Sequence, residues 1–463
     1  MRTRTIFMTV AGAVVAAVAA AASWLVVAPP DLLRLGDAYA AKMVCSNLFL
    51  AGRGAGRVLD EDVQAPGHPL LRLVRVSVDE QRKTVTARMF GFAAAGHAIF
   101  RDGLGCSNVT EGGFGAFPGN KSLRRRGPSQ DDPAPWPDGG GAEVSPPIQA
   151  LVDDDAMAGE GVRGIVVVKD GRIVAERYGE GFYTSTPLLG WSMTKTVTAA
   201  LVGIRIGDGQ MALNASDLLP QWRNDERSRI TLADLLSMQS GLQFNENYGS
   251  VTDATRMLFL ENDMAAYAAS RPLEASPGTR FAYSSGTSVI LARLWMNSFS
   301  SPREALTFPR TRLFRPLGMQ SAILEPDAHG TFVGSSYMYA TARDWARFAL
   351  LLLQDGKWNN EQILPDGFVR MMRTPTAASG GRFGGGQVWT RAGDEEADFP
   401  LGTYFMRGHD GQSIMLVPSM NLAVLRMGLT PRRSGYDVAI LQKAVIAAIA
   451  QRDASASPPA PAK

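Results

Sequence analysis

Ser192-Met193-Thr194-Lys195 is the stretch that decides the fold of this chain, because a helical pattern of apolar residues begins at the same point. The pattern predicts a largely buried helix from Met193 to Ile206, whose apolar face is formed by Val197, Ala200, Leu201 and Ile204. Residues three apart lie on one face of a helix, so Ser192 and Lys195 would bring a hydroxyl and an amine within hydrogen-bond reach.

Ser192 and Lys195 can act as nucleophile and base only in a suitable environment. A serine hydroxyl is a poor nucleophile until a base removes its proton. Lysine can be that base only where burial lowers its pKa well below about 10.4. Leu188, Leu189 and Trp191 supply an apolar flank, and the start of a helix favours a developing negative charge. The alternative is a helix-capping serine with a surface lysine, since Ser-x-x-Lys also arises by chance.

Tyr283 is the second candidate. Tyr283-Ser284-Ser285 follows a turn at Pro277-Gly278, which would deliver the phenol to a cleft. A phenol beside an ammonium group can exchange protons with it and relay one to a leaving group. The alternative is a tyrosine packed in the core with its hydroxyl satisfied.

The third candidate is the segment from Gly408 to Gln412, which lies between two strand-like runs. Its small residues would let a substrate lie against the edge of a sheet. The amide of Gln412, together with that of Ser192, is a candidate oxyanion hole for an acyl-transfer reaction. The alternative for His409 is a structural role in the turn.

In this order, Ser-x-x-Lys, Tyr-x-Ser and His-x-Gly resemble the serine β-lactamase and penicillin-binding-protein superfamily. The sequence is most similar to the class C-like esterases and 6-aminohexanoate-dimer hydrolases, over roughly residues 145 to 450. Three further segments carry the resemblance: Ile230–Leu242, Pro316–Met319 and Ala340–Phe348. The resemblance implies an α/β (α+β) fold in which an antiparallel sheet is flanked by helices and carries an inserted, mainly helical region.

The same resemblance implies that Ser192 is acylated, that Lys195 accepts its proton and that Tyr283 relays protons. His409 to Gly411 stand where lactam-binding members carry Lys-Thr-Gly, and the backbone after them, at Gln412, would line the oxyanion hole.

Two residues depart from that pattern. Ser285 replaces an asparagine that contacts the substrate amide, and His409 replaces a lysine that attracts the carboxylate of a β-lactam. A histidine with an ordinary pKa near 6.5 is mostly neutral at pH 7. We therefore expect a small-molecule ester or linear amide as substrate. The alternatives are a D-alanyl peptidase or β-lactamase, and a catalytically silent ligand-sensing module.

Composition restricts the remaining function classes. The 463 residues are 45% hydrophobic, as a globular core requires, and 47 basic against 44 acidic residues leave a net charge of +3. No nucleic-acid partner is expected at that charge. The four histidines stand far apart without zinc-ligand spacing, so neither a metal nor another cofactor is expected.

The N-terminus predicts export. Residues 6–28 contain no charged side chain and follow Arg2 and Arg4, so residues 1–30 are a signal peptide or a membrane anchor. The small residues Ala19 to Ser23 offer a cleavage site. The preceding arginines keep the N-terminus inside and place the rest of the chain at the periplasmic face, anchored or released.

An oxidising compartment permits a disulfide between Cys45 and Cys106, the two cysteines of the chain. Two buried free thiols are the alternative. Both lie in a predicted small module, residues 31–110, with a helix from Asp31 to Gly52 and a hairpin of Leu71–Val78 and Thr84–Met89.

The rest of the chain divides by composition. Residues 111–147 are rich in Pro and Gly and predict a linker or wrapping loop, 148–452 form the hydrolase domain, and 453–463 predict a disordered tail. A final helix is expected from Asp437 to Ala450. Strands are expected at Gly164–Lys169, Arg172–Glu176, Tyr404–Arg407, Ser413–Val417 and Leu422–Met427.

Overall fold

A six-stranded antiparallel sheet, in the strand order β12-β13-β14-β15-β5-β6, forms the centre of the predicted hydrolase domain (residues 148–452), which is called the catalytic domain below. The structure is a computed structural model that describes residues 2–110, 133–390 and 398–456. Five strands lie close to their predicted positions: β5 (Val162–Lys169), β6 (Arg172–Tyr178), β13 (Tyr404–Gly408), β14 (Gln412–Val417) and β15 (Leu422–Gly428). The short edge strand β12 (Trp389–Thr390) was not predicted. Because β15 pairs with β5, the two ends of the domain meet inside one sheet.

Both faces of this sheet are buried. On β5, Ile165 and Val167 face a core that includes α4 (Pro146–Asp153) and α14 (Ala439–Ala456). Val166 and Val168 face the larger core, where α12 (Ala342–Leu353) packs. Side chains on a strand alternate between faces, so a strand covered on both sides is a continuous apolar run.

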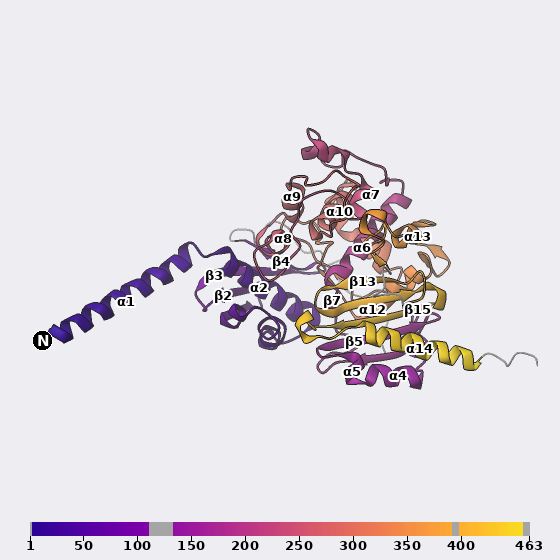
Figure 1. Cartoon of the computed structure of the whole chain (residues 1–463), viewed down its shortest axis with the longest axis horizontal. Helices are drawn as coiled ribbons and strands as arrows, with labels where there is room; N and C mark the ends of the chain where they lie inside the picture. Colours follow the sequence, from indigo (N-terminus) through magenta and orange to yellow (C-terminus); the bar gives the residue numbers. More distant parts are fainter. Residues whose placement is uncertain (1, 111–132, 391–397, 457–463) are drawn as a thin grey trace, which may run out of the picture.

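An inserted helical region stands on one side of the sheet (Figure 1). Its helices are α6 (Thr194–Gly207), α7 (Leu232–Leu236), α8 (Asp253–Leu260), α9 (Met264–Ala269), α10 (Ser285–Asn297), α11 (Pro302–Phe308) and α13 (Phe368–Arg373). Short strands connect it to the sheet domain: β7 (Leu188–Leu189), β8 (Ile323–Leu324) and β9 (Met338–Ala340) pair together, and β10 (Lys357–Trp358) pairs with β11 (Glu361–Gln362). The predicted fold class is confirmed.

The N-terminal module packs α2 (Asp31–Ala51) on a four-stranded sheet and is followed by the short helix α3 (Ala55–Val58). The strands are β1 (Val74–Asp79), β2 (Thr84–Met89), β3 (Ala93–Arg101) and β4 (Gly105–Val109). Sequence reasoning found β1 and β2 but missed β3 and β4.

The reason lies in the composition of β3, which starts with small residues of low strand propensity. These residues are small because α2 crosses the strand closely. A Cβ on Gly96 would lie 2.2 Å from the backbone nitrogen of Ala38. The close packing of α2 therefore requires small residues in β3, and these residues do not form the sequence pattern that predicts a strand.

Helix α1 (Arg2–Val27) extends away from the body of the molecule (Figure 1). Its segment Ile6–Val27 is 22 residues long, has a mean hydropathy of 2.3 and is not buried. It is long and apolar enough to cross a membrane, a property that signal sequences share.

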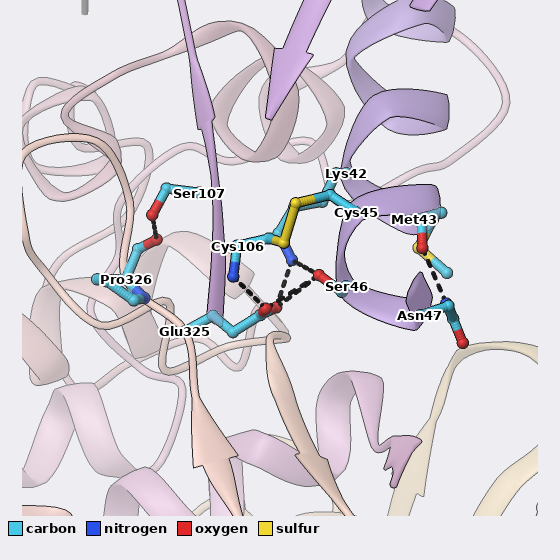
Figure 2. Close-up of a disulfide and its surroundings, with 9 residues drawn as sticks. All are labelled: Lys42, Met43, Cys45, Ser46, Asn47, Cys106, Ser107, Glu325 and Pro326. Carbon is cyan, nitrogen blue, oxygen red and sulfur yellow. Dashed lines mark hydrogen bonds and ion pairs between the residues drawn. A yellow bond between two sulfur atoms is a disulfide. The ribbon is translucent and has the colours of Figure 1, made fainter. Parts of the chain in front are cut away.

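Cys45 on α2 and Cys106 on β4 are joined in a disulfide, as expected (Figure 2). Beside it, Glu325 of the catalytic domain is fully buried and accepts hydrogen bonds from the module. The Cys106 backbone N–H donates to it at 2.6 Å, the Ser46 hydroxyl donates at 2.9 Å, and the Lys42 ammonium forms an ion pair with it. This carboxylate therefore ties the module to the catalytic domain, and Arg163 of β5 adds a second link by donating to Asp62 of the module at 2.7 Å.

The structure describes part of the predicted linker or wrapping loop and part of the predicted tail. Residues 111–132 of the predicted linker lie outside the described residues, but from 133 onward the chain wraps the catalytic domain. Trp136 is fully buried there, and Arg347 of α12 donates to the Pro137 carbonyl at 2.8 Å. Helix α14 continues to Ala456, so the predicted tail begins four residues too early; residues 457–463 lie outside the described residues.

Gly96→Ala should lower the free energy of unfolding by about 1 to 3 kcal/mol, because the new methyl group meets α2 backbone that cannot turn aside. Denaturant unfolding followed by circular dichroism measures the change. Gly56→Ala is the matched control, since a Cβ there meets nothing within 4 Å and alanine favours helix. Equal unfolding midpoints for the two variants would contradict the packing argument.

Candidate functional site

Ser192 lies in a short helical turn, Trp191–Met193, that leads directly into α6. Trp191 has a φ of +45°, unusual for a bulky residue, and Gly190 passes so close to Trp345 that a Cβ would lie 2.3 Å from its ring. Ser192 is partly exposed, whereas Lys195, one turn later, is 1% exposed. The hydroxyl is thus open to a ligand and the amine is shielded from water.

The Lys195 amine has three oxygen partners from three parts of the chain. Its Nζ lies 3.0 Å from the Ser192 Oγ, 3.0 Å from the Ser285 Oγ at the start of α10, and 3.2 Å from the carbonyl oxygen of Ser335. These contacts join the turn before α6 to α10 and to the loop between β8 and β9. Sequence spacing had indicated the first contact but not the other two.

Burial lowers the pKa of Lys195 to about 8, and the charge of Glu246 opposes that shift. The neutral amine is therefore available near pH 8, more than two units below the ordinary lysine value. That is the electrostatic condition a lysine base requires.

Glu246 is a residue of this site that sequence reasoning missed. Its Oε1 accepts from the Ser285 Oγ at 2.5 Å and its Oε2 accepts from the Ser285 backbone N–H at 2.7 Å. Burial raises the pKa of Glu246, while the charge of Lys195 lowers it. Glu246 lies in a loop between α7 and α8, where one acidic residue gives no pattern that separates it from a solvated carboxylate.

Tyr283 lies beside the amine, with the Lys195 Nζ 4.8 Å from the centroid of its ring. The ring stacks on Trp389, centroid to centroid 5.1 Å. Burial and the charge of Glu246 raise the pKa of Tyr283, and a hydrogen bond with Ser192 lowers it in part. The phenol therefore keeps its proton at neutral pH.

His409 lies close to Ser192 because β13 ends against the Ser192 turn: a Cβ on Gly408 would lie 2.4 Å from the Gly190 carbonyl oxygen. The imidazole stacks on Tyr248 at 4.8 Å and meets the edge of Trp191 at 5.6 Å, centroid to centroid. Its Nε2 lies 3.4 Å from the Asp410 Oδ1. Tyr248, like Glu246, was missed from the sequence.

Gly411 and Gln412 complete the turn between β13 and β14. Gly411 has a φ of +84°, and its carbonyl accepts from Arg426 Nη1 at 3.2 Å. The Gln412 side chain is fully engaged: its Nε2 donates to the Gly428 carbonyl and its Oε1 accepts from the Gly428 N–H at 3.0 Å. The side-chain amide thus holds β14 to β15, and only the backbone N–H of Gln412 is a candidate donor to a substrate.

The comparisons with known proteins agree with this architecture. The sequence matches the β-lactamase family over residues 150–445. This chain belongs to the β-lactamase family. The resemblance based on Ser-x-x-Lys, Tyr-x-Ser and His-x-Gly is thereby confirmed at the level of the superfamily. No curated protein matches this family member.

Solved structures share the fold of this β-lactamase-family chain. A Bacillus anthracis protein provisionally named as a 6-aminohexanoate-dimer hydrolase is 21% identical, with a TM-score of 0.56 over 66% of this chain and 82% of that one. A Bacteroides dorei protein provisionally named as a β-lactamase is 21% identical, with a TM-score of 0.52 over 64% and 96%. A penicillin-binding protein from Bacillus halodurans is 16% identical, with a TM-score of 0.51 over 65% and 99%.

Glu246→Gln should make the site reactive at lower pH. Removing the negative charge takes away the influence that raises the pKa of Lys195, so that pKa falls further below about 8. The acidic limb of the rate of fluorophosphonate labelling, plotted against pH, should then move to lower pH. Tyr283 and Tyr248 also face Glu246, but their pKa values are already raised and they stay neutral in this range.

Glu261→Gln, a carboxylate at the end of α8, is the matched control for this shift. An acidic limb that stays in place in Glu246→Gln would show that this carboxylate does not influence the amine.

Proposed function

We propose that this chain is an exported serine hydrolase that cleaves a carboxylic ester or a small linear amide through an acyl-enzyme on Ser192. The observation that carries the proposal is the arrangement of the Lys195 amine among the Ser192 Oγ, the Ser285 Oγ and the Ser335 carbonyl. Hydrolases of this fold and a family match over most of the catalytic domain support the reaction class.

A neutral amine has two N–H groups and one lone pair. The Ser335 carbonyl can only accept, and Ser285 gives its own hydrogen to Glu246, so both are acceptors toward the amine. With its two N–H groups held in this way, Lys195 directs its lone pair at Ser192. The amine is thus oriented to remove the proton of that hydroxyl.

The reaction then follows in two halves. The Ser192 Oγ attacks the substrate carbonyl carbon while its proton passes to Lys195, and the Tyr283 phenol gives its proton to the departing alcohol or amine. Lys195 returns a proton to Tyr283. Water then attacks the resulting ester of Ser192 and loses a proton to the same pair of residues. The pair returns that proton to the Ser192 Oγ as the bond to the acyl carbon breaks, which releases the acid and restores the Ser192 hydroxyl.

The backbone N–H groups of Ser192 and Gln412 are the proposed oxyanion hole. The close approach of Gly408 to Gly190 supports this assignment, because it brings the end of β13 and the start of β14 beside the Ser192 turn. Gly411 belongs to the same turn and keeps its backbone open to a bound substrate.

Three residues favour esters and simple amides over β-lactams. Ser285 is short, fully buried and occupied by Lys195 and Glu246, so it cannot bind a substrate amide as an asparagine would. His409 lies beside the carboxylate of Asp410, so a substrate carboxylate placed there would meet a negative charge. A D-alanyl peptidase or β-lactamase is the second enzyme hypothesis, and a silent ligand sensor the third.

Export is part of the proposal. The apolar segment Ile6–Val27 and the disulfide between Cys45 and Cys106 support a location outside the cytoplasm, at the periplasmic face. The N-terminal segment then either anchors the protein in the inner membrane or is removed as a signal peptide.

Treating the protein with a fluorophosphonate, a short-chain p-nitrophenyl ester and a chromogenic cephalosporin tests the reaction class. We expect labelling and ester turnover that disappear in Ser192→Ala and persist in Ser434→Ala, an exposed serine elsewhere. Absence of both labelling and turnover would rule out the enzyme. Turnover of the cephalosporin far above the ester would show that His409 and Ser285 do not exclude lactams.

Lys195→Ala should reduce the rate of acylation by roughly 10²- to 10⁴-fold, the usual contribution of a general base. Stopped-flow release of p-nitrophenol measures it. Lys443→Ala, which removes an exposed lysine on α14, should leave the rate unchanged. Near-normal acylation in Lys195→Ala would refute the role of this lysine as the base.

A further inference from the structure

Two phenylalanine side chains are exposed to solvent at one end of the N-terminal module. Phe90 and Phe92, in the turn between β2 and β3, are 46% and 49% exposed, and their rings stack with centroids 6.1 Å apart. Phe90 adopts a φ of +56°, a left-handed conformation that is strained for a bulky residue. Exposed aromatic rings on a strained turn indicate a surface that something else covers.

This turn lies at the end of the module from which α1 departs. Gly96 on β3 packs against Ala38 of α2, and Met89, at the end of β2, lies 3.7 Å from the position of a Cβ on Gly36. The end of β2 and the start of β3, which border the turn, therefore lie near the start of α2 at Asp31. Helix α1 ends at Val27, only four residues earlier, and contacts β3 (Figure 1).

A helix that crosses a bilayer would thus leave it beside Phe90 and Phe92. The apolar segment Ile6–Val27 is unburied and long enough to span. Trp24, in its last turn, is 55% exposed, and tryptophan favours the boundary between headgroups and acyl chains. The two phenylalanines would lie at that same boundary.

Arginines surround the turn, and the charge of one of them, Arg88, acts on the buried carboxylate of Asp37 from beyond ion-pair distance. Arg75 on β1 and Arg88 on β2 stand directly opposite one another, and the Arg75 Cγ lies 3.9 Å from the position of a Cβ on Gly91. Arg72 precedes them and is exposed. Among the described residues, no carboxylate lies within ion-pair distance of these three side chains. Like charges facing across two strands are unfavourable unless an anion lies between or above them.

We propose that this surface, formed by Leu73, Phe90 and Phe92 with Arg72, Arg75 and Arg88, docks on the face of an anionic phospholipid bilayer. The aromatic rings enter the boundary between headgroups and acyl chains, and the guanidinium groups bind lipid phosphates. The inference requires that α1 remains in the membrane and is independent of the chemistry at Ser192. It gives the catalytic domain a fixed orientation over the lipid surface, because the module is tied to that domain through Glu325.

The test uses the full chain, reconstituted through α1 into nanodiscs of phosphatidylglycerol and phosphatidylcholine whose acyl chains carry bromine. Phe92→Trp adds an indole at the proposed contact, and Leu401→Trp adds one at a site of the catalytic domain that is 81% exposed. The emission of the protein without an added tryptophan is subtracted, and each variant is compared with the same variant in discs without bromine. The indole at position 92 should lose most of its fluorescence to quenching by bromine, and the indole at position 401 almost none.

Equal quenching of the two indoles by bromine would overturn the proposal, as would failure of the chain to enter the discs. A shielded, blue-shifted indole at position 92 that bromine does not quench would show that protein covers the turn, and would overturn it as well. Replacing all three arginines by glutamine in the Phe92→Trp protein should reduce quenching in phosphatidylglycerol discs to the level in pure phosphatidylcholine. Unchanged quenching would exclude the phosphate contacts.

Discussion

A buried amine must find hydrogen-bond partners, and Lys195 takes its three partners from three separate parts of the chain. Leaving such a polar group without partners in the interior costs several kcal/mol. The turn that carries Ser192, the start of α10 and the loop of Ser335 must therefore meet around one nitrogen atom. Gln387 also joins α6 to α10: its carbonyl accepts a hydrogen bond from Thr196 on α6, and its side-chain oxygen accepts one from Ser288 on α10.

The N-terminal module is physically continuous with this arrangement, although the family match begins only at residue 150. Glu325, which holds Lys42, Ser46 and Cys106 of the module (Figure 2), stands at the base of the loop that carries Ser335. Its backbone N–H donates to the Tyr337 carbonyl at 2.8 Å and its carbonyl accepts from Val333 at 2.9 Å. The module therefore supports the loop that supplies one of the three partners of Lys195.

The sequence predicted the features that depend on local pattern. The strands of the central sheet are apolar runs between turns, the buried helix has helical periodicity, and Ser192 and Lys195 are neighbours on one helical face. The disulfide was predictable because the chain has only two cysteines and an apolar N-terminal segment of the kind that predicts export.

Features that depend on contacts between distant segments were not predictable. Glu246 matters because α10 places Ser285 against it, and no spacing in the sequence records that meeting. The small residues of β3 hide a strand because α2 needs the space. Trp136 is buried in a segment whose prolines predict a linker or a wrapping loop, and the sequence does not choose between the two. In each case the environment that gives the residue its role comes from another part of the chain.

Mass spectrometry of the trapped intermediate tests the central claim, the acylation of Ser192 by the substrate, most directly. The protein is mixed with p-nitrophenyl acetate, quenched in acid during turnover and digested. The account predicts an acetyl group on the peptide that contains Ser192, absent when the ester is omitted. Release of p-nitrophenol with no adduct, or with the adduct on another residue, would contradict it.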